Sequence, residues 1–168
     1  MFTPPKQKFL PIALCLIFFI TSCSSSEETV VAAAEEPVVE YIAPSTIENE
    51  ILNRINDYRV SINLSALNNF NIVKVPALNH THYMIDEQEI SHDGFNDRAS
   101  YLVENADIVS AAENVASGFT TAESVVDAWI ASDGHRANIE GDYNYFDVIA
   151  RKDSDGHWYY TNIFVKKP

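Results

Sequence analysis

Apolar residues recur at helical spacing in several stretches of this chain. The first stretch predicts a helix over residues 46–61 with one buried face, because its isoleucines return every fourth position. Ser45 and Glu48 stand at its start with the spacing of a capping box, in which each side chain accepts a hydrogen bond from the other residue's backbone. The same periodicity predicts further helices over residues 73–88, 95–104 and 121–131.

Shorter apolar runs predict strands rather than helices. They lie around residues 114–116, 146–150 and 158–165, with a short extended piece over residues 64–67. The segment Asp153-Ser154-Asp155-Gly156 between the last two strands is typical of a hairpin turn. Thr120 and Glu123 have capping-box spacing before the helix over 121–131. Helices flanking a small, mainly antiparallel sheet predict an α+β domain over residues 45–168.

The N-terminus has the pattern of a signal peptide over residues 1–22. Lys6 and Lys8 precede an apolar run that is too short to span a bilayer. Small residues then lead to Cys23, and this arrangement resembles the lipobox of bacterial lipoproteins. The resemblance implies cleavage before Cys23 and lipid attachment to its sulfur, whereas the alternative is an ordinary signal peptide with an incidental cysteine. Two or more acyl chains would anchor the protein stably.

Residues 23–44 read as a linker between the lipid and the domain. They hold serines, acidic pairs and prolines, a composition that buries too little apolar surface to offset the entropy of ordering. Glu27 and Glu28 resemble a surface-export signal of some Gram-negative lipoproteins. We therefore expect an extracytoplasmic protein of the cell envelope, anchored by lipid at the outer membrane or the cell surface.

The charge of the chain argues against two classes of partner, and its cysteine content argues against a disulfide. The formal net charge is -13, which argues against nucleic acid and against electrostatic attraction to anionic membrane surfaces. The membrane is therefore expected as a partner only through the N-terminal lipid. Cys15 lies in the segment predicted to be removed, so no disulfide is expected to stabilise the mature domain.

Three polar residues beside turn-forming residues are the candidates for a shared site: His92, Glu113 and His135. His92 could bind a metal, act as a base or donate to a ligand, and the alternative is a turn histidine that caps the next helix. Glu113 begins a buried strand and needs a partner, which could be a histidine or one of the arginines Arg98 and Arg136. His135 is predicted just past a helix end, in a glycine-containing turn.

The wide spacing of these residues leaves their chemistry open. Two histidines and one carboxylate can hold zinc or another divalent cation, so His92 and His135 are the candidate metal ligands. No nucleophile motif accompanies them, and no cofactor follows from the residues alone. The other histidines, His80 and His82 among them, are predicted to be structural or exposed.

Several short motifs resemble the CAP superfamily, the group of cysteine-rich secretory proteins, antigen 5 and pathogenesis-related 1 proteins, in its bacterial SCP-like branch. They occur in the family's order between about Glu48 and Phe164. They are Asn56-Asp57-Tyr58-Arg59, His80-Thr81-His82-Tyr83-Met84, Ser91-His92, Asp97-Arg98, Glu113-Asn114-Val115-Ala116, Ala128-Trp129-Ile130-Ala131-Ser132, Gly134-His135-Arg136-Ala137-Asn138-Ile139 and Trp158-Tyr159-Tyr160-Thr161-Asn162-Ile163-Phe164.

The resemblance implies an α-β-α sandwich with a central cavity, which in the family is often lined by two histidines and two acidic residues. By motif position the histidines are His92 and His135, and the first acid is Glu113. Ser132 stands where the second acid would be, so the set is incomplete. This departure argues against metal binding and against carboxylate-dependent hydrolysis.

Three interpretations of the cavity follow. The first is a non-enzymatic module that binds a lipid, a glycan, a peptide or a protein. The second is a hydrolase, peptidase-like, with or without a divalent metal at His92, Glu113 and His135. The third is a buried polar network that only fixes the fold.

Overall fold

The computed structural model describes residues 41–168. The predicted signal peptide over 1–22, the lipid-attachment residue Cys23 and most of the predicted linker lie outside these residues. The elements in chain order are α1 (Thr46–Ser61), β1 (Asn68–Asn69), the 3-10 helix η1 (Asn71–Val73), α2 (Lys74–Glu87), α3 (Phe95–Ala106), β2 (Ser110–Ser117), α4 (Ala122–Ala131), α5 (Asp133–Ile139), β3 (Tyr145–Lys152) and β4 (Trp158–Lys166).

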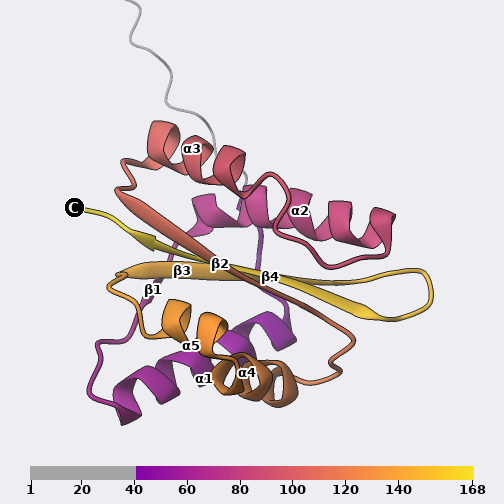
Figure 1. The fold of residues 1–168 in the computed structure, drawn as a ribbon, viewed down its shortest axis with the longest axis horizontal. Helices are drawn as coiled ribbons and strands as arrows, with labels where there is room; N and C mark the ends of the chain where they lie inside the picture. Colours follow the sequence, from indigo (N-terminus) through magenta and orange to yellow (C-terminus); the bar gives the residue numbers. More distant parts are fainter. Residues whose placement is uncertain (1–40) are drawn as a thin grey trace, which may run out of the picture. The chain divides into compact units, whose positions relative to one another are not determined.

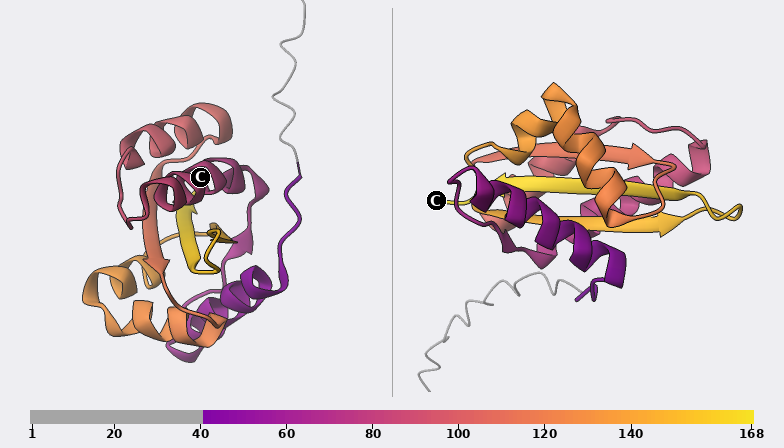
Figure 2. Two further views of the ribbon diagram at one scale, coloured as in Figure 1. Left: turned by 90° about the vertical axis from the view of Figure 1, so that its right-hand side faces the viewer. Right: turned by 90° about the horizontal axis from the view of Figure 1, so that it is seen from below.

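The strands form one four-stranded sheet in the order β1-β3-β4-β2. β1 pairs with β3 in parallel, while β4 is antiparallel to both β2 and β3. Helices α2 and α3 cover one face of the sheet, and α1, α4 and α5 cover the other (Figures 1 and 2). The predicted α+β class and the α-β-α sandwich with a mainly antiparallel sheet are confirmed.

Each face of the sheet carries its own hydrophobic core. Trp129, Phe146 and Phe164 belong to the core under α1, α4 and α5, whereas Leu102 and Ile163 belong to the core under α2 and α3. Fully burying a side chain of this kind contributes roughly 1.5–3 kcal/mol. Since residues 41–168 contain no cysteine, burial of this kind rather than a disulfide stabilises the domain.

The predicted capping box at the start of α1 is present. The Ser45 backbone N–H donates to Glu48 Oε2 at 2.7 Å, and the Glu48 N–H donates to Ser45 Oγ. The other oxygen of the buried Glu48 accepts from the backbone of Ala150 at 2.8 Å and from Arg151 at 2.7 Å. One carboxylate therefore both begins α1 and attaches it to β3.

The predicted cap of α4 was wrong by one residue. The N-cap is Thr121 rather than Thr120: Thr121 has extended backbone angles and accepts from the Ser124 N–H. Ser124, in place of Glu123, completes the box. A serine hydroxyl can close a capping box, which a search for a carboxylate three positions on overlooks. The hairpin turn is as predicted, with Gly156 at φ +87°, a conformation that glycine adopts without strain.

Side chains satisfy backbone groups along both edges of the sheet. Beyond the short β1, the β3 N–H groups of Val148 and Ala150 donate to the carboxylates of Asp147 and Glu48. On β2, the carbonyl of Val115 accepts from Trp129 Nε1 at 3.2 Å. Such caps remove the unpaired backbone groups that would otherwise pair with another chain.

A buried ion pair joins α2 to β3. Lys74 Nζ lies 3.5 Å from Asp147 Oδ1, and both side chains are 2% exposed. Nζ has no hydrogen-bond partner among residues 41–168. Burial raises the pKa of Asp147 to about 6, while Lys74 and the Val148 N–H act in the opposite direction. The raised pKa of Asp147 therefore stabilises the fold at pH values below the ordinary pKa of 3.8. This contribution is lost as the pH rises through about 6.

This pair predicts a measurable titration. In a ¹³C NMR pH titration, the Asp147 carboxyl should have its midpoint near pH 6. Lys74→Met should move the midpoint higher, because it removes the cation that favours the charged form. Lys152→Met, an exposed lysine on the same strand, is the matched control and should leave it unchanged. An ordinary carboxyl midpoint near 3.8, or one indifferent to Lys74→Met, would contradict this account.

Candidate functional site

Glu113 lies in the middle of β2 and points into the layer formed by α2 and α3. Its side chain is 1% exposed. Arg98 from α3 holds it with two parallel hydrogen bonds, from Nε to Oε2 and from Nη2 to Oε1, both 2.8 Å long. Bidentate pairs of this kind combine charge with fixed geometry. Of the alternatives open in the sequence, Arg98 is therefore the arginine that neutralises Glu113.

Two histidines complete the cluster around this carboxylate. His92 Nδ1 lies 2.9 Å from Glu113 Oε1, and since a carboxylate only accepts, Nδ1 carries the proton. His80 Nε2 lies 3.9 Å from the same oxygen and donates to the carbonyl of Ser91 at 2.7 Å. Both Glu113 oxygens therefore already accept hydrogen bonds. We call Glu113, Arg98, His92 and His80 the Glu113 cluster.

The loop between α2 and α3 is built to hold this cluster. Gly94 at φ +70° precedes α3 and allows the chain to turn, and the Phe95 N–H donates to the His92 carbonyl. Arg98 Nη1 donates to the Asp93 carbonyl at 2.7 Å, so Arg98 binds both the loop and Glu113. A Cβ at Gly94 would lie 3.5 Å from Arg98 Nη1.

Burial lowers the pKa of two histidines and so favours their neutral form. Desolvation lowers the pKa of His80, and the hydrogen bond to Ser91 opposes this shift. Burial also lowers the pKa of His135, and the charge of nearby His92 lowers it further. His92 differs from both, because its side chain is 53% exposed. It is therefore the member of the cluster most open to a solute.

His135 lies on α5, near enough to His92 for the charge of His92 to act on its imidazole. Successive residues of a strand point to opposite faces, so Asn114 points away from the side of Glu113. The Asn114 amide donates to the His135 carbonyl at 3.0 Å. The prediction that His135 stands in a turn past a helix end is wrong, because Ser132 is extended and the chain resumes a helix, α5, at Asp133. Gly134 does not interrupt that helix.

Ser132 lies between α4 and α5 and is half-buried, and its side chain makes no cap bond to α5.

The predicted ligands His92, Glu113 and His135 fit a cation poorly, because Arg98 already occupies the carboxylate of Glu113. Over residues 41–168, no group of three or more His, Cys, Asp or Glu residues is arranged to hold a metal. A cation at His92 and His135 stays a prediction.

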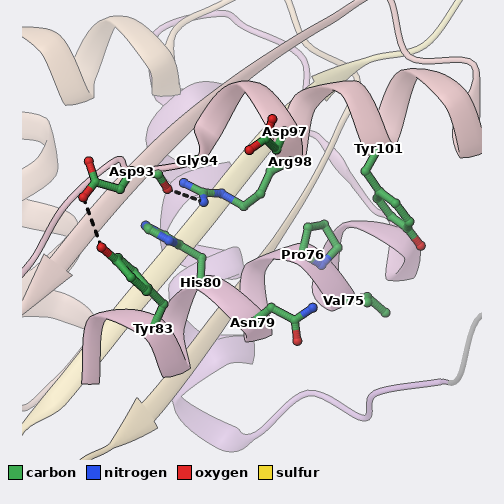
Figure 3. A pocket seen from close by; sticks show the side chains of 10 residues that line it. All are labelled: Val75, Pro76, Asn79, His80, Tyr83, Asp93, Gly94, Asp97, Arg98 and Tyr101. Carbon is green, nitrogen blue, oxygen red and sulfur yellow. Dashed lines mark hydrogen bonds between the residues drawn. The ribbon is translucent and has the colours of Figure 1, made fainter. Parts of the chain in front are cut away.

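A pocket of about 520 Å³ lies between α2 and α3, next to the Glu113 cluster (Figure 3). His80 and Arg98 belong to both, so the pocket and the cluster share a wall. The predicted residues His92, Glu113 and His135 do not line it. The lining consists of Val75, Pro76, Asn79, His80, Tyr83, Asp93, Gly94, Asp97, Arg98 and Tyr101.

Sequence reasoning missed this pocket because it assigned His80 only a structural or exposed position. The available signal was the spacing of Pro76, His80 and Tyr83, which stand three or four positions apart and so share a helix face. Only the arrival of Arg98 from the next helix turns that face into a pocket wall.

Solved structures share this fold. The chain superposes on an outer surface protein from Borrelia burgdorferi with a TM-score of 0.67 and 20% identity, covering 77% of this chain and 98% of that one. For a cysteine-rich secretory protein from Staphylococcus aureus the TM-score is 0.62 at 19% identity, covering 74% and 40% of the two chains. For an extracellular SCP-domain protein from Bacillus anthracis it is 0.58 at 25% identity, covering 75% and 45%.

Sequence comparison adds a curated relative. The chain is 30% identical over 128 residues to the uncharacterized membrane protein YlbC of Bacillus subtilis (strain 168), covering 73% of this chain and 35% of that protein. It therefore spans about a third of that relative's length. Within residues 41–168, no helix has the length and apolar character needed to cross a membrane. Residues 52–164 match the CAP family, described as the cysteine-rich secretory protein family. The chain belongs to this family.

Proposed function

We propose that this CAP protein is a non-enzymatic binding module, held outside the cytoplasm by an N-terminal lipid. Neighbours of matching fold include an outer surface protein and an extracellular protein, which supports the location. The lipid anchor rests on the sequence around Cys23 and on the acidic linker that follows it. The same lipobox-like sequence at Cys23 is the reason for proposing a bacterial source.

One observation carries the binding proposal: a carboxylate whose two oxygens already accept hydrogen bonds lies beside a pocket. Glu113 accepts from Arg98 at both oxygens and from His92 at one, so the cluster holds fixed geometry. The pocket of about 520 Å³ lies in the size range of ligand sites. The arrangement therefore favours recognition of a lipid, glycan, peptide or protein group over bond cleavage.

One observation favours a hydrolase as the second candidate. His92 donates through Nδ1 to Glu113, and its Nε2 has no hydrogen-bond partner among residues 41–168. A histidine oriented by a carboxylate with its other nitrogen free has the geometry of a general base. The peptidase-like alternative, with or without zinc at His92 and His135, rests on the hydrogen bond between His92 and Glu113.

Binding in the pocket can be tested without knowing the ligand. A fragment mixture added to ¹⁵N-labelled domain should shift amide signals of residues 75–83 and 93–101. Asn79→Trp, which places a large ring at a lining position, should abolish the shifts. His82→Trp, exposed on the same helix and outside the lining, is the matched control and should keep them. Shifts confined to other surfaces, or none, would refute the proposal.

The lipid anchor has its own test. In cells fed a labelled fatty acid, the wild-type protein should carry label and sediment with membranes, and Cys23→Ser should lose both properties. Cys15→Ser is the matched control, because Cys15 lies in the segment predicted to be removed and should not affect labelling. Label that persists in Cys23→Ser would rule out this anchor.

The hydrolase alternative predicts the opposite outcome in an activity assay. On our account the purified domain cleaves neither casein nor p-nitrophenyl esters, with EDTA or with added zinc. Turnover that disappears in His92→Ala and persists in His82→Ala would establish the hydrolase instead. A thermal unfolding curve for each variant confirms that both remain folded.

A further inference from the structure

The charges around the pocket do not balance. Asp93, Asp97 and Arg98 are the formally charged residues of its lining. The positive charge of Arg98 is offset by its bidentate ion pair with Glu113 behind the wall. Burial lowers the pKa of His80 and so disfavours a positive charge on it. The two aspartates therefore leave the pocket with an excess of negative charge.

Both aspartates are accessible. Asp97 is exposed in the first turn of α3 and forms no ion pair within residues 41–168. Asp93 is also exposed, and its carboxylate accepts one hydrogen bond from the Tyr83 hydroxyl at 3.2 Å. Carboxylates in such positions are available to a cationic group and repel an anionic one.

Aromatic rings stand at both ends of the pocket. Tyr83 is 41% exposed and stacks on His80 with ring centroids 5.8 Å apart. Figure 3 shows Tyr83 and Asp93 at one end, and Tyr101 and Val75 at the other. The faces of tyrosine rings attract ammonium and guanidinium groups electrostatically. The Tyr83 end thus offers a carboxylate and an aromatic face to one cation.

The rest of the pocket is suited to an apolar stem. Val75 and the buried Pro76 line it from α2, and Tyr101 faces them from α3. Along α2 the lining extends from Val75 to Tyr83, which at 1.5 Å per residue is about 12 Å. A linear chain of several carbons fits this length.

We propose that this pocket binds an amphipathic organic cation, an ammonium or guanidinium group on an apolar stem. The cationic group lies by Asp93, Asp97 and Tyr83, and the stem lies along Val75 and Pro76. The inference rests on the proposed binding function and narrows it to one chemical class. Ligands whose recognised group is a phosphate or a carboxylate are excluded by the two aspartates.

The test uses probes that share one chain length and differ in head charge: hexylammonium, hexanol and hexanoate. Each is titrated by ¹⁵N NMR into the domain at low salt. Hexylammonium should bind about tenfold more tightly than hexanol, as one charge-assisted contact is worth about 1.4 kcal/mol or more. Hexanoate should bind more weakly than both.

Variants then locate the charge. Asp97→Asn and Asp93→Asn should each weaken hexylammonium binding by roughly three- to tenfold and leave hexanol unchanged. Glu104→Gln, exposed on the same helix but outside the lining, is the matched control. Thermal unfolding midpoints confirm that all three variants fold.

The outcomes distinguish failure of the cation proposal from failure of the proposed binding function. If hexanol or hexanoate binds in the pocket as tightly as hexylammonium, the pocket binds ligands but the cation proposal is wrong. Equal loss in Glu104→Gln would also overturn it, since the attraction would then come from the acidic surface as a whole. If no probe shifts residues 75–101, both the cation and the pocket proposals fail.

Discussion

A carboxylate buried on one face of a sheet needs a partner, and in this protein Glu113 finds it in Arg98. Because the arginine comes from the first turn of α3, the pairing fixes where that helix starts. The loop before α3 must then turn at Gly94. This turn brings His92 to Glu113 Oε1, an oxygen that also accepts from Arg98. His80 on α2 fixes the other side of that loop through Ser91. The pocket is the space that these constraints leave between α2 and α3.

Most local features of this fold could be predicted from the sequence, whereas most contacts between distant segments could not. The capping box at Ser45 and the hairpin at Gly156 depend on neighbouring residues, and both were found. The second contact of Glu48, with Ala150, joins residues more than a hundred positions apart and left no local pattern.

The candidate site shows the same division. His92 and Glu113 were named from the sequence, and the structure brings them together. His135 was named with them, and its imidazole lies near enough to His92 to be affected by its charge, but it forms no hydrogen bond or ion pair with the cluster within residues 41–168. His80 was overlooked because its role depends on Arg98 arriving from another helix.

The most direct test of the account is the coupling between Arg98 and Glu113. Urea unfolding would be measured for wild type, Arg98→Met, Glu113→Gln and the double variant. Each single variant should lose about 3–5 kcal/mol, because it leaves one buried charge without its partner. The double variant should lose at least about 2 kcal/mol less than the sum of the single losses. Losses that add to within about 0.5 kcal/mol would show that the two residues act independently, which would contradict the account.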